Sequence, residues 1–132
     1  MEIDKYIFIA QADGSTTKIN IKNADSVLRV KEIIEKELII PRECQKLYNR
    51  VNKSTMVLEE NYKFSDSEIV YLTVVISDMD EELEIYKRAC KENNFQLFKR
   101  ARELGVEWDE SVCEYAARYN RLEILKWARE NG

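Results

Sequence analysis

The side chains that most often carry out chemistry in proteins are few in this sequence and widely separated. It contains no histidine, and its three cysteines, Cys44, Cys90 and Cys113, form no C-x-x-C pair. Without an imidazole, a serine or cysteine nucleophile lacks its usual base, and three thiols leave a tetrahedral zinc site one ligand short. We therefore expect no catalytic residue, metal ion, cofactor or enzymatic activity. The competing hypothesis, a cysteine enzyme, rests on these thiols alone; Cys90 and Cys113 are better interpreted as small packing residues in helices.

Two acidic pairs, Glu81-Glu82 and Asp109-Glu110, have the composition of a carboxylate dyad. Acidic side chains also stabilise the first turn of a helix, and they are common on solvated helix faces. We favour these structural roles for both pairs.

The charge balance excludes further classes of function. The 132 residues carry 21 basic and 25 acidic side chains, a net charge of −4, without a block of Lys and Arg. Nucleic acid is therefore not expected as a partner. No apolar run approaches the ~20 residues of a membrane span, and residues 1–5 are too acidic for a secretion signal. Together with the odd number of cysteines, this predicts a cytoplasmic protein.

Alternation and helical spacing divide the first half into elements. Residues 6–10 and 17–21 predict two strands joined by a turn at Gly14, which is free to adopt a positive φ. Asp25-Ser26 is a suitable N-cap for a helix whose apolar residues recur at helical spacing. Ile40-Pro41 is expected to end that helix, because the residue before proline avoids the α region.

The order expected for the first half is β-β-α-β-β. Residues 45–51 predict a weak strand, residues 49–55 are polar and typical of a loop, and residues 69–76 predict the strongest strand of the chain. After Ser77 the β-branched residues become rare and the composition favours helices through Gly132. Asp78 followed by Glu81 is expected to start the first of these helices.

The helical half repeats itself after 27 residues. Seven identities relate the two copies: Ala89/Ala116, Asn93/Asn120, Lys99/Lys126, Ala101/Ala128, Arg102/Arg129, Glu103/Glu130 and Gly105/Gly132. The apolar pattern follows the same shift. We interpret residues 79–105 and 106–132 as two helix–turn–helix units, with Gly105 and Gly132 as helix stops.

Residues 5–76 resemble ubiquitin and its β-grasp relatives. The resemblance is carried by Val30-Lys31 through Ile34, by Ile40-Pro41 and by Gln45-Lys46-Leu47, and it runs without gaps from Lys5 to Leu47. It implies a β-grasp fold. Ubiquitin is conjugated through a Leu-Arg-Gly-Gly tail, whereas this chain contains no Gly-Gly pair, so we expect that it is neither conjugated nor released by a ubiquitin-specific protease.

The resemblance also implies a recognition surface. Ubiquitin presents a small apolar patch, whose three positions align with Ala12, Tyr48 and Leu72. Ala12 has less apolar bulk than the family's residue and Tyr48 is an aromatic replacement, which suggests a shifted set of partners; ordinary sheet residues are the alternative. The lysine most used for polyubiquitin chains aligns near Asn52-Lys53, so chain extension there is not expected.

Residues 79–132 resemble ankyrin repeats of a short variety found in large DNA viruses and some protists. The second copy carries the signature, from Trp108-Asp109-Glu110 through Cys113-Glu114-Tyr115-Ala116-Ala117 to 120–132, and the first copy is degenerate. The resemblance implies stacked repeats that bind other proteins, and a viral protein acting in the host cytoplasm.

The end of a two-repeat array requires an explanation, because such arrays generally need about three units and a polar cap. We expect Trp108 to pack between repeats and Leu125 and Trp127 to lie on the free edge, as a partner-binding surface. Three explanations remain open: the array belongs to a longer chain, it packs on the ubiquitin-like half, or its edge forms a homodimer or binds a partner.

The sequence thus predicts an α+β protein, with a β-grasp domain in residues 1–76 and an all-α ankyrin-type repeat pair in residues 77–132. We expect a non-enzymatic protein–protein interaction module, an adaptor or ubiquitin mimic whose partners include ubiquitin-pathway proteins. The alternative is an ankyrin-repeat binding protein in which the β-grasp half is only a structural cap, because a fold by itself does not carry a function.

Overall fold

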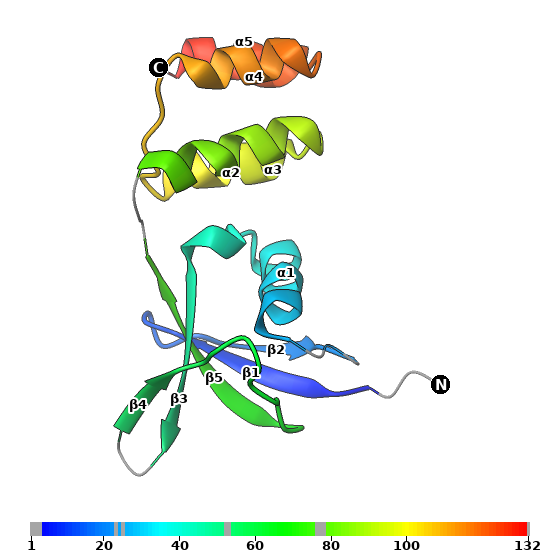
Figure 1. Ribbon diagram of the computed structural model, residues 1–132, viewed down its shortest axis with the longest axis vertical. Coiled ribbons are helices and arrows are strands. Elements are labelled where there is room, and N and C mark those ends of the chain that lie inside the picture. Colours follow the sequence, from blue (N-terminus) through cyan, green and yellow to red (C-terminus); the bar gives the residue numbers. More distant parts are fainter. Residues whose placement is uncertain (1–3, 23, 25, 52–53, 76–78, 132) are drawn as a thin grey trace. The chain divides into compact units, whose positions relative to one another are not determined.

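The chain folds into two compact units of different composition (Figure 1). The computed structural model describes residues 4–22, 24, 26–51, 54–75 and 79–131. Residues 1–38 and 44–75 form the first unit, and residues 39–43 and 76–132 form the second. Their strands and helices make this an α+β fold, as the sequence predicts.

The first unit is built on a mixed five-stranded sheet. Its strands are β1 (Tyr6–Gln11), β2 (Thr16–Asn20), β3 (Gln45–Val51), β4 (Ser54–Val57) and β5 (Glu68–Val74). Their spatial order is β2-β1-β5-β3-β4. β1 and β5 are parallel, and the other neighbours are antiparallel. The sequence did not predict β4, which lies partly in the segment expected to be a loop.

Helix α1 (Val27–Leu38) begins where the expected cap stands. The Ser26 Oγ accepts a hydrogen bond from the backbone N–H of Arg29 at 3.2 Å. Asp25, the other predicted capping residue, lies outside the described residues. The helix ends before Ile40-Pro41, and a short 3-10 helix, η1 (Arg42–Cys44), leads into β3.

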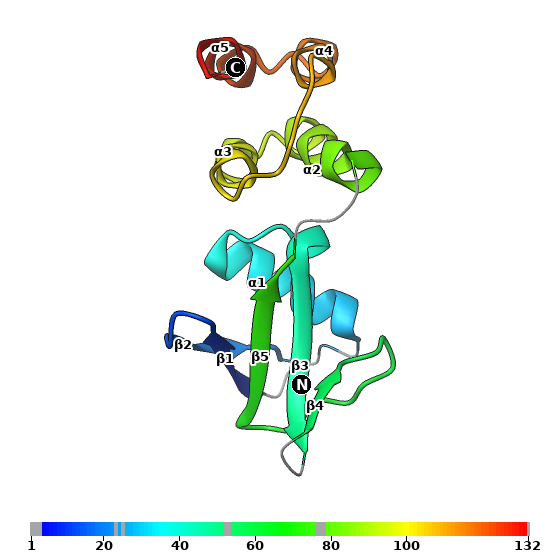
Figure 2. The same ribbon diagram turned by 90° about the vertical axis from the view of Figure 1, so that its left-hand side faces the viewer.

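One face of the sheet and one face of α1 form the core of this unit. Helix α1 covers one side of the sheet (Figure 2). Apolar residues at alternate strand positions are buried on this side. Their fractional exposure does not exceed 4 %. The residues concerned are Ile7, Ile9, Ile19, Leu47, Val70 and Leu72 from the strands and Val27, Val30 and Ile34 from α1.

The second unit contains two helix pairs. The first pair is α2 (Met79–Lys91) with α3 (Phe95–Glu103), and the second is α4 (Ser111–Arg118) with α5 (Leu122–Glu130). Within each pair the helices pack together, and α2 also packs on α4, which joins the pairs (Figure 2). Asp78, the predicted start of α2, lies outside the described residues.

Several of the repeated residues occupy helix ends. Asn93, Gly105 and Asn120 have positive φ angles of 55°, 89° and 58°, and each stands two residues after the last residue of α2, α3 or α4. In each case the next residue donates its N–H to a carbonyl five residues earlier: Asn94 to Ala89, Val106 to Ala101 and Arg121 to Ala116, at 2.7–3.0 Å. This is the hydrogen bonding of a Schellman motif, which favours Gly or Asn at the left-handed position.

The remaining repeated positions include small residues at packing contacts. Ala89, Ala101, Ala116 and Ala128 are at most 2 % exposed, which allows neighbouring helices to approach closely. None of the helices in the described part of the chain is long and apolar enough to cross a membrane.

Candidate functional site

The side of the sheet opposite α1 is a candidate binding surface, which we call the open sheet face. Strand register places on it one outward-pointing set of residues from each strand: Tyr6, Phe8 and Ala10 of β1; Thr16, Lys18 and Asn20 of β2; Lys46, Tyr48 and Arg50 of β3; Thr55 and Val57 of β4; and Ile69, Tyr71 and Thr73 of β5. Ile69 and Val57 are large apolar residues that remain 52 % and 49 % exposed. The face therefore offers apolar and aromatic surface without a covering element among the described residues of its own unit.

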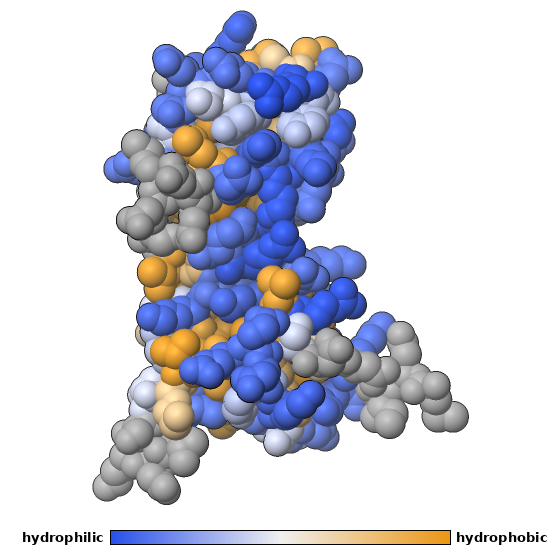
Figure 3. Space-filling view, viewed as in Figure 1, coloured by the Kyte–Doolittle hydropathy of each residue, from blue (hydrophilic) through white to orange (hydrophobic). Residues whose placement is uncertain are grey.

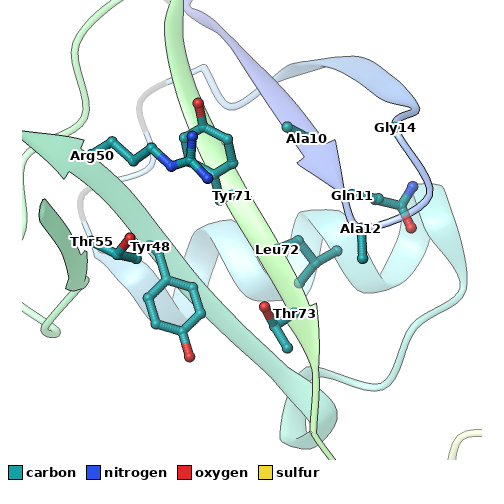
Figure 4. Close-up of a pocket in the computed structure, with 10 residues that line it drawn as sticks. All are labelled: Ala10, Gln11, Ala12, Gly14, Tyr48, Arg50, Thr55, Tyr71, Leu72 and Thr73. Atoms are coloured by element: carbon teal, nitrogen blue, oxygen red, sulfur yellow. The ribbon is translucent and has the colours of Figure 1, made fainter. Parts of the chain in front are cut away.

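A hollow of about 650 Å³ opens at the end of this face near the β1–β2 turn (Figure 4). Ala12 and Tyr48, which are predicted to share a recognition surface, both line it. Tyr71 and Thr73 of β5 and Arg50 of β3 complete its sheet side. The structure thus brings a residue of the first turn together with residues of the third and fifth strands.

Leu72 does not lie on the open sheet face, which corrects the predicted patch. Its side chain is only 4 % exposed, and it points to the α1 side with Val70. Since strand residues alternate between faces, the neighbours Tyr71 and Thr73 take the outward positions. Leu72 is one of the residues that line the hollow, but it does not lie on the open sheet face.

Tyr71, Thr73 and Arg50 are the residues that sequence reasoning missed. Tyr71 pairs directly with Tyr48 across β3 and β5, and Thr73 pairs with Lys46. The alternation within residues 69–76 could have identified Tyr71 and Thr73 once Val70 was assigned inward, and the alternation of β3 places Arg50 on the same side as Tyr48. Alignment by residue type instead selected Leu72, because that position was expected to be apolar.

Basic side chains stack on the tyrosines of this face. The Arg50 Cζ lies 4.6 Å from the centre of the Tyr71 ring (Figure 4), and the Lys46 Nζ lies 6.0 Å from the centre of the Tyr48 ring. The Lys18 Nζ lies 4.3 Å from the ring of Tyr6. These are cation–π distances.

The open sheet face therefore differs in charge from the whole chain. Its described strand residues include Lys18, Lys46 and Arg50 and no acidic side chain. The net charge of the chain is nevertheless −4. Such a face favours a partner with acidic groups around an apolar contact.

The second predicted surface, the repeat edge, is only partly where it was expected. Trp108 packs between the helix pairs, with its ring centre 5.5 Å from that of Tyr86 and 5.7 Å from that of Phe98. Trp127 also faces the first pair, at 6.0 Å from Phe98 and 6.1 Å from Trp108. The expectation that Trp127 lies on a free edge is thus wrong, because the indole is engaged in this aromatic cluster.

Leu125, the other residue of the predicted repeat edge, is half-buried on α5. It is one position after the buried Ile124. Leu122, one turn earlier, is 68 % exposed. Apolar surface therefore does remain on α5 at Leu122, whereas Trp127 is only partly exposed.

The cysteines are placed poorly for nucleophilic chemistry. Cys44 and Cys90 are buried, and Cys113 is partly exposed. Burial raises the pKa of the Cys90 thiol to about 11, so that it remains protonated at neutral pH. Within the described ranges, no cluster of three or more Cys, Asp or Glu side chains could hold a metal ion.

Comparison of the chain with models of known protein families and with curated proteins gave no match.

Proposed function

We propose that this protein is a non-enzymatic protein–protein interaction module. In this proposal residues 1–76 are a ubiquitin-like β-grasp domain and residues 77–132 are two ankyrin-type repeats, so the chain acts as an adaptor or ubiquitin mimic. Its ubiquitin-like half engages ubiquitin-pathway proteins through the open sheet face, and its helical half holds a second protein. The element order β-β-α-β-β-β with one helix across a mixed sheet is consistent with the first assignment.

One observation carries the proposal: an aromatic and basic sheet face borders a hollow that Ala12 and Tyr48 line. Tyr48 and Tyr71 are adjacent across the strands. Tyrosines supply large amphipathic contact area at a low cost in side-chain entropy, and they are frequent at the centres of protein interfaces. The face offers such anchors and carries no nucleophile–base pair among its described residues, so occupancy is the mechanism that it supports.

The charge of the face indicates the partner's chemistry. Lys18, Lys46 and Arg50 lie on the same side as the tyrosines. A partner segment with an apolar centre flanked by Asp or Glu would complement this surface and associate faster at low salt.

The test is affinity capture from a eukaryotic lysate with the tagged full chain, followed by mass spectrometry. The binding variant is Tyr48→Ala/Tyr71→Ala, which removes both adjacent aromatic anchors. The matched control is Leu28→Ala/Lys36→Ala, because these residues are exposed on α1, away from the sheet face. Circular dichroism verifies that all three proteins are folded.

Ubiquitin receptors or proteasome-linked proteins that bind the wild type and the control, but not the tyrosine variant, would support the proposal. Proteins of unrelated kinds held equally by all three chains would contradict it. That result would move the binding activity to the helical half and favour the alternative in which the first half is a structural cap. Removal of residues 1–76 would then be expected to unfold the helices.

A further inference from the structure

The hollow on the open sheet face has two sides of different composition. Three of the four lining residues from β1 and its turn, Ala10, Ala12 and Gly14, carry no side-chain atom beyond Cβ. Tyr48 of β3 and Tyr71 of β5 line the opposite side (Figure 4). The hollow is therefore bordered by methyl groups and bare backbone on one side and by aromatic rings on the other.

The register of the sheet explains why this space is open. Ala10 pairs with Tyr71, which in turn pairs with Tyr48, so the three side chains form one row across the face. Phe8 occupies the preceding outward position of β1. Since Ala10 lacks the ring that Phe8 carries, the face is hollowed beside Tyr71. A side chain at Gly14 would have no neighbour within 4 Å, so the open space continues past the end of β1.

The hollow carries a positive charge. Arg50 is the one charged side chain among the described residues that line it. The Arg50 Cζ lies 4.6 Å from the centre of the Tyr71 ring, and the guanidinium forms no ion pair within the described part of the chain. A guanidinium that is held on a ring and lacks an acidic partner favours a carboxylate, to which it can donate two hydrogen bonds.

Apolar surface adjoins the hollow. Ile69 and Val57 of the same face are 52 % and 49 % exposed. Figure 3 shows apolar side chains over the part of the first unit where β3, β4 and β5 lie. The volume of about 650 Å³ also falls within the range of ~300–1,000 Å³ that is typical of ligand sites. The hollow can therefore take up a large side chain together with adjoining backbone.

We propose that this hollow is the docking site for a partner segment in which a large apolar side chain stands next to an Asp or Glu. The apolar side chain enters between Ala12 and Tyr48, and the Arg50 guanidinium binds the carboxylate. Ala12 determines the specificity, because a larger residue in its place would fill the space that the partner's side chain occupies. The docking site rests on the function proposed above and specifies the chemistry of the partner.

A second copy of this chain is not the occupant that the charges favour. A symmetric dimer through the open sheet face would place Lys46 and Arg50 of two chains close together, and the described strand residues of this face include no acidic side chain to compensate. Like charges across an interface oppose association. An acidic partner segment meets no such repulsion.

The test titrates the ¹⁵N-labelled full chain with the capped peptide Gly-Asp-Phe-Asp-Gly. Two control peptides replace Phe by Ala, or both Asp by Lys. We expect saturable amide shifts at Ala12, Tyr48 and Thr73 with the first peptide only. Ala12→Leu is expected to weaken binding at least about tenfold, because the added side chain overfills the hollow. Ala117→Leu makes the same substitution at an exposed position of α4 and should leave the affinity unchanged.

Arg50→Gln separates the charge from the apolar contact. It keeps a polar side chain of similar length and is expected to weaken binding roughly threefold, the scale of an exposed ion pair. Equal shifts with the Ala peptide would exclude the apolar anchor, and equal shifts with the Lys peptide would exclude the role of Arg50. Unchanged binding by Ala12→Leu would place the contact outside the hollow. Each of these results would overturn the docking site.

The lysate capture distinguishes this docking site from the function on which it rests. Loss of partners by Tyr48→Ala/Tyr71→Ala but not by Ala12→Leu would overturn the docking site and leave the proposed function intact. Retention of the partners by both variants would overturn both. Sedimentation velocity tests the remaining occupant: a dimer that Ala12→Leu dissociates would assign the hollow to a second copy instead.

Discussion

The guanidinium of Arg121 connects the two helix pairs through the end of α2. Its Nε donates a hydrogen bond to the carbonyl oxygen of Cys90 at 2.8 Å, and its Nη2 donates to that of Lys91 at 3.2 Å. The last carbonyls of a helix lack intrahelical partners and carry the negative end of the helix dipole. A cation at the start of α5 therefore satisfies and stabilises the end of a helix in the preceding pair.

We expect Arg121→Ala to destabilise the helical unit by about 1–2 kcal/mol, because hydrogen bonds from a charged donor are stronger than neutral ones. Urea unfolding monitored by circular dichroism measures the change. Arg118→Ala, at an exposed position of α4, is the control and should change stability by less than about 0.5 kcal/mol. Equal effects of the two substitutions would contradict this role of Arg121.

Tyr86 of α2 supplies a buried hydrogen bond to the segment that connects α3 and α4. Its hydroxyl donates to the carbonyl oxygen of Val106 at 2.6 Å, and both residues are 0 % exposed. Tyr86→Phe keeps the ring contacts but removes the donor, which is expected to cost about 1–3 kcal/mol. Tyr119→Phe, at the partly exposed residue that follows α4, should be nearly neutral. If Tyr86→Phe lowered the melting temperature no more than Tyr119→Phe does, the Tyr86 hydrogen bond would contribute little to stability.

The left-handed backbone at Asn120 predicts that glycine is tolerated better than a β-branched residue at this position. At a φ of 58°, a β-branched residue is strained by about 1–2 kcal/mol, whereas glycine is not. We expect Asn120→Gly to be near neutral and Asn120→Val to lower the melting temperature. The same pair of substitutions at Asn93, with a φ of 55°, should behave alike. If Val and Gly were equally tolerated at both sites, the left-handed conformation would be wrong.

Because the pKa of Cys90 is raised, the free energy of unfolding is expected to vary with pH in the alkaline range. Burial raises this pKa from its ordinary value of 9.0 to about 11. The thiol ionises more readily in the unfolded chain, so its contribution is complete below pH 9 and is lost as the pH rises toward 11. Unfolding free energies across this range should fall more steeply for the wild type than for Cys90→Ala. Parallel pH profiles would show that this thiol is not protected by burial in the native state.

Charge reversal on the open sheet face tests its electrostatic role. Arg50→Glu is expected to weaken capture of a face-bound partner roughly tenfold, because it introduces a like charge opposite an acidic partner. Raising the salt concentration should weaken wild-type capture in the same direction. Lys36→Glu on α1 changes the net charge equally and serves as the control. Equal losses in both variants would indicate a general charge effect.

Much of the secondary structure follows from local patterns. A short apolar run predicted β1, alternation predicted β2, and a high density of β-branched residues predicted β5, each to within two residues of the observed ends. β3 has the predicted bounds. Ser26 caps α1 as its position indicates, and the helix ends before Ile40-Pro41. These features depend on neighbours a few residues away, which the sequence displays directly. β4 was missed because its residues Ser54 and Thr55 are polar, and because the strand exists only through pairing with β3.

The repeat was also visible in the sequence, although its physical basis was not. Identity at Asn93 and Asn120 reflects a left-handed backbone, and identity at Ala89 and Ala116 reflects a close helix contact. Both constraints are local to a turn or a helix face, so they recur whenever the unit recurs.

Tertiary structure alone decided which side chains face outward. Tyr71, rather than Leu72, lies beside Tyr48 because the register of β3 and β5 is set by pairing across more than twenty residues. Trp127 faces the first pair because its ring packs on Phe95 and Phe98 of α3 and on Trp108, which follows that helix. A shift of one residue in a strand, or a rotation of one helix, would exchange buried and exposed side chains without altering any local pattern. The sequence by itself therefore determined most of the elements and their repetition, whereas long-range packing determined β4 and the surfaces that remain to bind a partner.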